Sequence, residues 1–312
     1  MYFARQTSFC IAVISLLSYP AFAAKFQIKP NTTVIGHVRT IQTERSTNFA
    51  ALARKYDLGY DEIVAANTAI NPFKVPAGSV LILPTQYILP NAAHRGLVVN
   101  LPEKRLYFFR NKTVFTFPIG IGRLGWATPI GHMHIIGKMK NPPWYVPASI
   151  RAEQAKFGNF LPKVMPAGPK NPLGQYALRL SKSNYLIHGT HEPEGVGSRV
   201  SGGCLRMYPE DIEQLHQLVP IGTTVNIVNQ PIKTANIHNT FWLESHPPLT
   251  QSQDDKNIRD GVDMNLAMSL SEAQHYSHDL LTTHNIEPIS NEWLNLVIAV
   301  SSGIPVIVGH SL

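Results

Sequence analysis

Cys204 and His188 are the residues of this sequence best suited to nucleophilic catalysis. His188 lies near the end of the strand-like run "YLIHGT", and Cys204 follows sixteen residues later in "SGGC". A thiol attacks a carbonyl carbon well only as the thiolate, so it needs a base or a positive environment to lose its proton. The pair predicts a thiol acyl-transfer site with His188 as the base. The alternative is that Cys204 is a small buried hydrophobic residue.

The residues around Cys204 fit the same chemistry. Gly202 and Gly203 let the backbone turn sharply and aim N–H groups at one point, where they can hold the negative oxygen of a tetrahedral intermediate. Ser201 can hydrogen-bond locally, and the guanidinium of Arg206 can bind a substrate carboxylate. Each has an ordinary structural alternative, since paired glycines mark a turn and an arginine can pair at the surface. Together they indicate acyl transfer on an anionic substrate.

The N-terminus predicts export. Arg5 is the only charge before Lys25, an apolar run covers Phe9–Leu17, and Ala21 and Ala23 stand where a signal peptidase requires small residues. The run is too short for the roughly 20 residues of a membrane-spanning helix, which argues against an anchor. We therefore expect residues 1–23 to be a cleaved signal peptide. We also expect the protein to be periplasmic and to have no membrane span after cleavage.

Cleavage would leave Cys204 as the one cysteine of the mature chain. The chain has 2 cysteines, and the other, Cys10, lies in the predicted signal peptide. An internal disulfide is then excluded. An unpaired cysteine in an oxidising compartment is a liability unless its chemistry is needed.

Charge is distributed unevenly along the chain. The net charge is +7, with +12 on residues 24–229 and −6 on residues 230–312. The basic part suits anionic partners. Nucleic acid is not expected, because the chain is predicted to be exported and lacks a basic run with interleaved aromatics. The acidic tail either docks across the basic part and regulates access to Cys204, or only completes the fold.

Three regions follow the signal peptide, and the middle one is rich in predicted strands. Residues 31–86 form a small unit, residues 95–230 the catalytic domain, and residues 231–312 an acidic extension. The predicted strands of the catalytic domain are "GLVVNL", "RLYFFR", "TVFTFPIGIG", "GHMHIIGKM", "YALRLS", "YLIHGT" and "TTVNIVN". One long helix is expected over 209–219, with Pro209 in its first turn.

The flanking regions mix helices and strands. In the first unit, Ser46 or Thr47 can cap a helix that begins near Phe49, and a second helix is expected over 61–67, before a strand in "AGSVLILP". In the tail we expect a polar loop over 251–263 and a helix over 269–282. The final run "WLNLVIAVSSGIPVIVG" is broken by polar residues, Gly and Pro, which favours two buried strands over a membrane segment.

These segments resemble a known family. "IHGT…RVSGGCLRM" resembles the active-site signature of L,D-transpeptidases with a YkuD-type catalytic domain. "LILPTQYILPNAAHRGLVVNLPEKRLYFF", "TPIGHMHIIGKMKNPPWYVPASI" and "NPLGQYALRLSKSNYLIHGT" are similar to the ErfK/YbiS/YcfS/YnhG subgroup over about residues 31–245. Residues 31–86 resemble a LysM glycan-binding module, although "RSTNF" replaces its usual Gly-Asp-Thr-Leu opening, so a spacer without a ligand is the alternative.

The resemblance implies a mainly β fold: a YkuD-like β-sandwich catalytic domain with one long helix, preceded by a small α+β LysM-like module. It implies that Cys204 attacks the third residue of a peptidoglycan tetrapeptide stem, releases D-alanine and forms a thioester that an amine resolves. His188 would carry the proton, with its ring oriented by the Gly189 carbonyl. The N–H groups of Gly203 and Cys204 would form the oxyanion site, and Ser201 would support the loop.

The resemblance also supplies substrate-binding candidates. Arg206 would meet a stem carboxylate, Trp144 and Tyr145 would form a lid or wall, and Thr190 would contact the substrate. No cofactor is implied, and the 13 histidines show no metal-ligand spacing. Partners would be peptidoglycan stems and glycan, with an outer-membrane lipoprotein as a further candidate.

Gly202 departs from the family pattern, which has histidine there. His132, His134 or His191 could supply a second imidazole in space. The acyl acceptor stays open: a lipoprotein lysine, which the match through the LysM-like unit favours, diaminopimelate giving 3-3 crosslinks, or water, giving a carboxypeptidase or hydrolase. A peptidoglycan-binding protein with a degenerate catalytic domain is the alternative of a different class.

Overall fold

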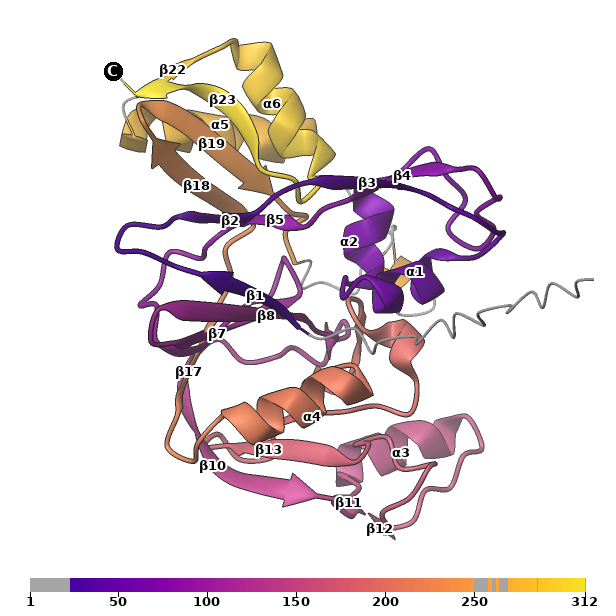
Figure 1. The fold of residues 1–312 in the computed structure, drawn as a ribbon. Helices are drawn as coiled ribbons and strands as arrows, with labels where there is room; N and C mark the ends of the chain where they lie inside the picture. The colour runs from indigo at the N-terminus through magenta and orange to yellow at the C-terminus, as the bar shows by residue number, and fades with distance from the viewer. Residues whose placement is uncertain (1–22, 250–257, 260–261, 264–268, 285, 312) are drawn as a thin grey trace, which may run out of the picture.

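The structure, a computed structural model, describes residues 23–249, 258–259, 262–263, 269–284 and 286–311. The predicted signal peptide, with Cys10, lies outside the described residues except for Ala23, as does most of the loop predicted over 251–263. The described part forms three units, which follow one another from bottom to top of Figure 1 as the catalytic sheet, the N-terminal unit and the C-terminal unit. The fold is mainly β, as predicted.

A curled nine-stranded sheet forms the catalytic domain. Its strand order is β1-β8-β7-β6-β17-β10-β13-β14-β16, and all neighbours are antiparallel except the parallel pairs β6–β17 and β14–β16. All seven predicted strands are confirmed. The strands are β1 (Ala24–Gln27), β6 (Gly96–Asn100), β7 (Arg105–Arg110), β8 (Thr113–Pro118), β10 (Gly131–Lys140), β13 (Tyr176–Leu180), β14 (Leu186–His188), β16 (Leu205–Arg206) and β17 (Thr224–Val228).

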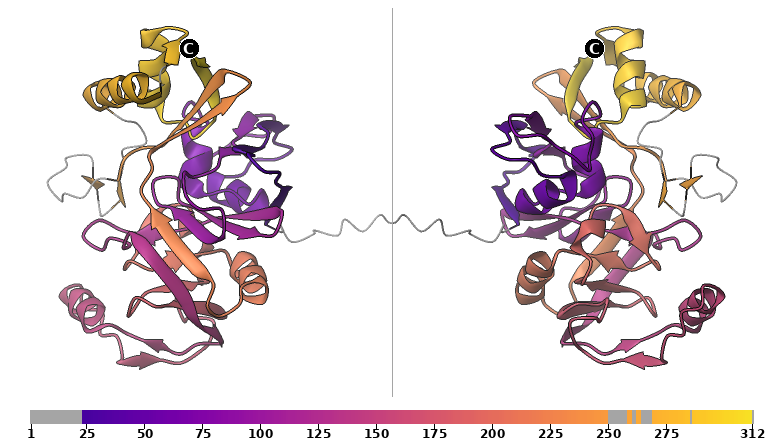
Figure 2. Two further views of the ribbon diagram at one scale, coloured as in Figure 1. Left: turned by 90° about the vertical axis from the view of Figure 1, so that its left-hand side faces the viewer. Right: turned by 90° about the vertical axis from the view of Figure 1, so that its right-hand side faces the viewer.

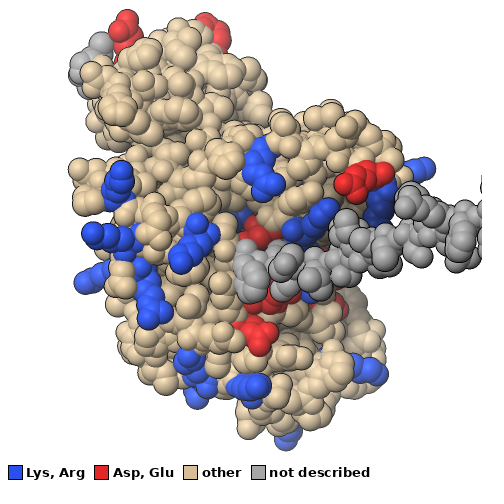
Figure 3. Space-filling view, in the orientation of Figure 1, with Lys and Arg blue, Asp and Glu red and all other residues tan. Residues whose placement is uncertain are grey.

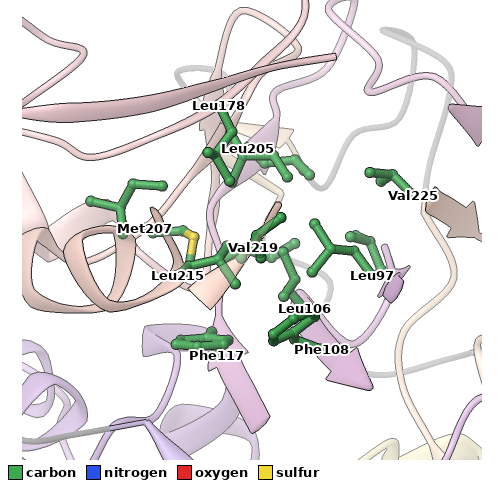
Figure 4. Packing of buried hydrophobic residues seen from close by; sticks show 14 of the residues in the cluster. Leu97, Leu106, Phe108, Phe117, Leu178, Leu205, Met207, Leu215, Val219 and Val225 are labelled. Atoms are coloured by element: carbon green, nitrogen blue, oxygen red, sulfur yellow. The ribbon is translucent and has the colours of Figure 1, made fainter. Parts of the chain in front are cut away.

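One apolar cluster holds the curled sheet and its helix together (Figure 4). The predicted helix is confirmed as α4 (Pro209–Leu218), which begins with Pro209 and ends one residue before the buried Val219. Its Ile212 and Leu215 are fully buried, and its Glu213 accepts a hydrogen bond from Tyr176 of β13 at 3.0 Å. Helix α4 is therefore fixed against the strand that neighbours His188.

The N-terminal unit packs two short helices against two small antiparallel pairs. β2 (Val34–Gly36) pairs with β5 (Gln86–Ile88), and β3 (Arg39–Gln42) pairs with β4 (Val80–Leu83). The helices are α1 (Phe49–Lys55) and α2 (Tyr60–Ala65). The prediction of Ser46 or Thr47 as the helix cap is wrong, because Asn48 accepts the Ala51 N–H at 2.9 Å. Thr47 instead pairs with Val75 in an isolated β-bridge.

The C-terminal unit is a four-stranded sheet covered by two helices. Its order is β18 (Ile232–Ile237), β19 (Thr240–Ser245), β23 (Val306–Ser311) and β22 (Ile286–Pro288). The helix predicted over 269–282 is confirmed as α5 (Leu270–His284). The side views of Figure 2 show this unit at the end of the molecule away from α3 (Ala148–Lys156). A further short pair joins β20 (Ile258–Arg259) to β21 (Val262–Asp263).

The prediction of two strands in the final apolar run is wrong for its first half. This segment forms α6 (Asn291–Val300). The Ser290 side chain caps its N-terminus by accepting the Trp293 N–H, and the helix ends at Ser301, whose backbone has a left-handed conformation. Leu294 and Ile298, one helical turn apart, are buried, so helical spacing outweighs the β-branched composition. Within the described residues, no helix is long and apolar enough to cross a membrane.

A buried ion cluster joins the three units. Lys233 of β18 places its Nζ 2.8 Å from Glu103 Oε2 and 2.7 Å from Glu244 Oε1, and it donates to the Ile88 carbonyl of β5 at 2.6 Å. His246 donates to Glu244 at 2.6 Å. Glu103, Glu244 and His246 have side-chain types that bind metals, but the Lys233 ammonium fills the space between the two carboxylates. The cluster is therefore complete without a metal.

Lys233→Met should be strongly destabilising. It leaves two carboxylates buried without their cation, a change that typically costs about 3–5 kcal/mol. Urea unfolding followed by circular dichroism measures the loss. The exposed Lys29→Met is the matched control and should change stability by less than about 0.5 kcal/mol. Equal stability of the two variants would contradict the assigned role of Lys233.

The basic residues lie mainly below the C-terminal unit. Figure 3 shows Lys and Arg spread over the face formed by the catalytic sheet and the N-terminal unit. No described residue after 229 lines the cavity beside Cys204, but β21 contacts β15 (Arg199–Ser201) just before the cysteine turn, so the hypothesis that the acidic tail regulates access to Cys204 stays a prediction.

Candidate active site

A parallel strand pair brings Cys204 beside His188. β14 and β16 pair in the register Ile187↔Leu205 and His188↔Arg206, and the Met207 N–H donates to the His188 carbonyl at 2.9 Å. Cys204 immediately precedes β16, level with the residue before Ile187. The fifteen residues between His188 and Cys204 therefore form a loop that returns the chain to the neighbouring strand.

The imidazole of His188 is held in one tautomer. Its Nδ1 lies 2.6 Å from the Gly189 carbonyl oxygen, which can only accept, so Nδ1 carries the proton and Nε2 is the basic nitrogen. Burial lowers the pKa of His188 to about 3, the nearby charge of Arg206 acts in the same direction, and the bond to Gly189 opposes both. His188 is therefore neutral at pH 7 and able to accept a proton.

The thiol of Cys204 is partly buried and protonated at rest. Sγ lies 3.7 Å from the Asn184 carbonyl, to which it donates. Burial raises the pKa of Cys204, while a backbone hydrogen bond at Leu186 and the charge of Arg206 oppose the shift. The resting pair is thus a neutral thiol and a neutral imidazole. Proton transfer must then accompany attack on the substrate.

Ser201 locks the turn before Cys204. Its hydroxyl donates to the Cys204 carbonyl at 2.5 Å and accepts the Gly203 N–H at 3.1 Å. The Gly203 N–H was expected to point at the oxyanion, but in this structure it is bound to Ser201. Thr128 adds a second support, since its hydroxyl donates to the Gly203 carbonyl at 3.0 Å. The Cys204 N–H is the expected oxyanion donor that remains.

The two glycines of the turn face different surroundings. Gly203 has φ +102°, and a side chain there would place Cβ 3.0 Å from the Tyr185 ring. At Gly202 a Cβ would lie 3.2 Å from Ile150 Cδ1 and 3.6 Å from the Trp126 ring. The space that a histidine at 202 would need is therefore occupied by apolar side chains.

None of the three histidines considered as substitutes lines the cavity. His132 and His134 lie on β10 opposite β17, and His191 is 3.4 Å from the Glu192 carboxylate. Among the described residues that line the cavity, His188 is the histidine.

Arg206 lines the cavity, and its guanidinium has a hydrogen-bond donor left without a partner among the described residues. Nη1 lies 3.8 Å from Glu192 Oε2, and the buried Nε has no hydrogen-bond partner in the described part of the chain. Thr190 is buried and accepts the Glu192 N–H at 2.9 Å. It does not line the cavity, so its role in the structure is to hold the loop that carries Glu192.

A cavity of about 850 Å³ opens over these residues. Its far wall comes from α3 (Ala148–Lys156) and from β11 (Trp144–Tyr145), which pairs with β12 (Val164–Met165). The cavity residues from the predicted site are Trp144, Tyr145, His188, Ser201, Cys204 and Arg206. Tyr145 is 72% exposed, so this wall presents an aromatic surface to whatever enters.

Sequence reasoning missed the other polar residues of the cavity. Arg123 pairs with Glu153 of α3, and Arg179 and Asn184 also line the space. Arg123 could have been found from its position directly after the strand-like run that becomes β9 (Ile121–Gly122). β9 pairs with β15 (Arg199–Ser201), which leads into the cysteine turn. Loop backbone atoms such as the Asn184 carbonyl leave no signal in the sequence.

Comparison with known proteins decides the family. A family model described as the YkuD L,D-transpeptidase catalytic domain matches residues 94–227. The probable L,D-transpeptidase YcfS of Escherichia coli is 38% identical over 271 residues, which cover 84% of this chain and 85% of that protein. This chain belongs to the L,D-transpeptidase family. Related proteins include ErfK/SrfK of Salmonella typhimurium, at 36% identity over 80% of this chain and 82% of that protein, and YbiS of Escherichia coli, at 37% over 78% and 79%.

The predicted resemblance to the ErfK, YbiS and YcfS proteins is thereby confirmed over most of the chain. The L,D-transpeptidase domain spans the curled sheet from β6 to β17 and includes both His188 and Cys204.

Alkylation of Cys204 by iodoacetamide should rise steeply with pH. Because the thiol pKa is raised and His188 stays neutral, we expect about a tenfold increase per pH unit between pH 6 and 8. Mass spectrometry of quenched samples measures the rate. His188→Gln is the control and should keep the same pH profile. A rate that is flat from pH 5 to 7 and collapses in His188→Gln would instead indicate a thiolate–imidazolium pair.

Gly203→Ala should disable the turn, whereas Gly202→Ala should be tolerated. Alanine at 203 takes a left-handed conformation against the Tyr185 ring, a strain of about 1–3 kcal/mol. Alanine at 202 meets only the end of the flexible Ile150 side chain. We expect at least about a tenfold slower acylation of Cys204 in Gly203→Ala and little change in Gly202→Ala. Equal rates in both variants would contradict the described turn geometry.

Proposed function

We propose that this L,D-transpeptidase uses Cys204 as the nucleophile of a two-step acyl transfer on peptidoglycan stems. The observation that carries the proposal is the placement of Cys204, directly before β16, next to β14, which carries His188; the Gly189 carbonyl fixes the His188 tautomer, and both side chains line one cavity. The relatives named as probable L,D-transpeptidases support the reaction class.

In the first step, Sγ of Cys204 forms a bond to the carbonyl carbon of the third stem residue while its proton passes to His188 Nε2. The Cys204 N–H stabilises the oxyanion. When the tetrahedral intermediate collapses, the bond to the terminal D-alanine nitrogen breaks and His188 returns the proton to that amine. A thioester remains on Cys204.

In the second step, an acceptor amine attacks the thioester and His188 takes its proton. The carbon–sulfur bond breaks, and the proton returns to the thiolate. Arg206 supports the choice of substrate, since its buried Nε has no hydrogen-bond partner among the described residues and suits a carboxylate of the stem. Trp144 and Tyr145 would cover the stem from the α3 side of the cavity.

We further propose that the protein works in the periplasm after cleavage of residues 1–23, and that a lipoprotein lysine is the acceptor. The small residues at Ala21 and Ala23 support cleavage. Diaminopimelate of a second stem and water are the competing acceptors, and the experiment below separates them.

The mature protein should form a Cys204 adduct with a diaminopimelate-containing tetrapeptide muropeptide, with loss of D-alanine. Intact-protein mass spectrometry detects the adduct, and the product masses identify the acceptor when a peptide ending in lysine is also present. Cys204→Ala should form no adduct. His188→Gln should acylate about 10²–10⁴-fold more slowly, the usual contribution of a general base.

Transfer to the lysine peptide supports lipoprotein attachment, and muropeptide dimers support 3-3 crosslinking. A free tripeptide product means that water is the acceptor. If the folded protein forms no adduct and releases no D-alanine, the proposal is refuted, and the chain is better described as a peptidoglycan-binding protein with a degenerate site at Gly202.

A further inference from the structure

A buried pair of carboxyl groups lies between the N-terminal unit and the catalytic domain, far from the cavity residues. Asp57, in the turn between α1 and α2, is 7% exposed, and Asp211, in the first turn of α4, is 1% exposed. In the described part of the chain, Asp57 Oδ1 and Asp211 Oδ2 receive no N–H or O–H from another residue. Each carboxyl group can be the other's partner only when one of them carries a proton.

The nearby cations are already matched to other carboxylates. Arg105 is fully buried, its Nη2 bonds Glu62 Oε2 at 2.6 Å and lies 3.5 Å from the Asp57 carbonyl oxygen, and its Nε donates to no described residue. At the rim, Lys104 pairs with Asp61 at 3.1 Å, and Arg54 pairs with Glu210 at 2.8 Å. The charged or titratable groups that interact with Asp57 or Asp211 are Arg105, Glu62, Glu210, Tyr87 and Tyr208. When it holds one shared proton, the pair keeps one negative charge, and the buried cation that acts on it, Arg105, is already paired with Glu62.

Among the described residues, the N–H that reaches this pair belongs to Ala24. The Ala24 N–H, at the start of β1, donates to Asp57 Oδ2 at 3.1 Å. The preceding Ala23 N–H donates to Gln214 Oε1 at 3.2 Å, one helical turn after Asp211 on α4. The peptide bond between Ala23 and Ala24 is the bond that the predicted signal peptidase site would cut.

Cleavage would change the chemistry of this nitrogen. Water adds across the peptide bond, the carboxylate leaves with Ala23, and the Ala24 amine takes up a proton. A neutral amide with one N–H becomes an ammonium with three N–H groups and one positive charge. Removal of Ala23 also leaves Gln214 Oε1 without its donor, so a third oxygen becomes available beside the new N-terminus.

We propose that Asp57 and Asp211 form an intramolecular binding site for the α-ammonium of Ala24, created when the signal peptide is removed. The proposal rests on the proposed cleavage of residues 1–23. Its basis is the 3.1 Å contact, the unpartnered buried carboxyl oxygens and the lack, among the described residues, of a cation paired with them. The bound ammonium fastens β1, at the edge of the sheet, to the N-terminal unit through Asp57 and to the catalytic domain through Asp211.

The ionisation of the pair agrees with this role. Burial raises the pKa of Asp57 to about 7, and the charge of Glu62 adds to the shift, against the opposing Arg105, Ala24 and Asp211 contributions. Burial and the Asp57 charge raise the pKa of Asp211. With an amide at Ala24, the folded state retains protons that the unfolded state has lost, so stability falls as pH rises above about 4. An ammonium lowers these pKa values and reduces that fall.

The test compares two full-length mature proteins that differ only at the N-terminus. One begins at Ala24, and the other keeps Phe22 and Ala23, so that its Ala24 nitrogen is an amide. We expect the melting temperature of the Ala24 protein to be about 3–6 °C higher at pH 7. This difference in melting temperature should shrink above about pH 8, where an unpaired α-ammonium loses its proton. The pH at which it shrinks rises with the extent to which pairing raises the pKa of the ammonium.

Asp57→Asn supplies the matched control in both proteins. Asp57 has φ +56°, a conformation that asparagine tolerates, so the variant removes charge without backbone strain. The difference between the two N-termini should fall below about 1 °C in this background. Asp211→Asn serves the same purpose, and should also reduce the difference.

Equal melting temperatures of the two unsubstituted proteins, or a difference that persists in both asparagine variants, would overturn the proposal. So would an exported protein whose N-terminus, read by mass spectrometry, is not Ala24. Thioester formation at Cys204, measured on the same samples, is a separate readout. Its failure would refute the proposed transpeptidation while leaving the N-terminal comparison intact.

Discussion

The active site depends on the parallel pairing of β14 with β16. This pairing places the turn that carries Cys204 next to the strand that carries His188, although the two residues are sixteen apart in the chain. A shift of one residue in the register would turn alternate side chains to the other face and separate the thiol from the imidazole. The surrounding features, namely the Ser201 hydrogen bonds, the positive φ of Gly203 and the packing of α4, all hold this register in place.

Burial decides the charge state of the reacting groups. The same low-polarity surroundings lower the pKa of His188 and raise that of Cys204, which favours a neutral pair over an ion pair. The positive charge of Arg206 lowers both pKa values, so it opposes the effect of burial at the Cys204 thiol and adds to it at the His188 imidazole. Elsewhere, buried charges serve to join units: Lys233 binds Glu103 and Glu244 across the three units, and Arg105 binds Glu62.

The sequence was sufficient where a pattern is local. Alternating apolar residues predicted the strands, and Pro209 with its spaced apolar residues predicted α4. It failed where two local patterns compete. The β-branched run before Ser301 forms a helix because Leu294 and Ile298 share one buried face. Asn48 caps α1 because Thr47 is paired with Val75 in a β-bridge. It could not show that Gly203 donates to Ser201, or that Ile150 fills the space beside Gly202, since both depend on contacts between distant segments.

His188 is a neutral base with its proton on Nδ1. Nitrogen NMR of protein labelled with ¹⁵N-histidine measures this directly, with His188→Gln used to assign the signal. We expect a protonated Nδ1 and an unprotonated Nε2 for His188 from pH 5 to pH 8, unchanged in Cys204→Ala. Two protonated nitrogens at pH 7 that become a neutral ring in Cys204→Ala would contradict it, because they would show a resting thiolate–imidazolium pair.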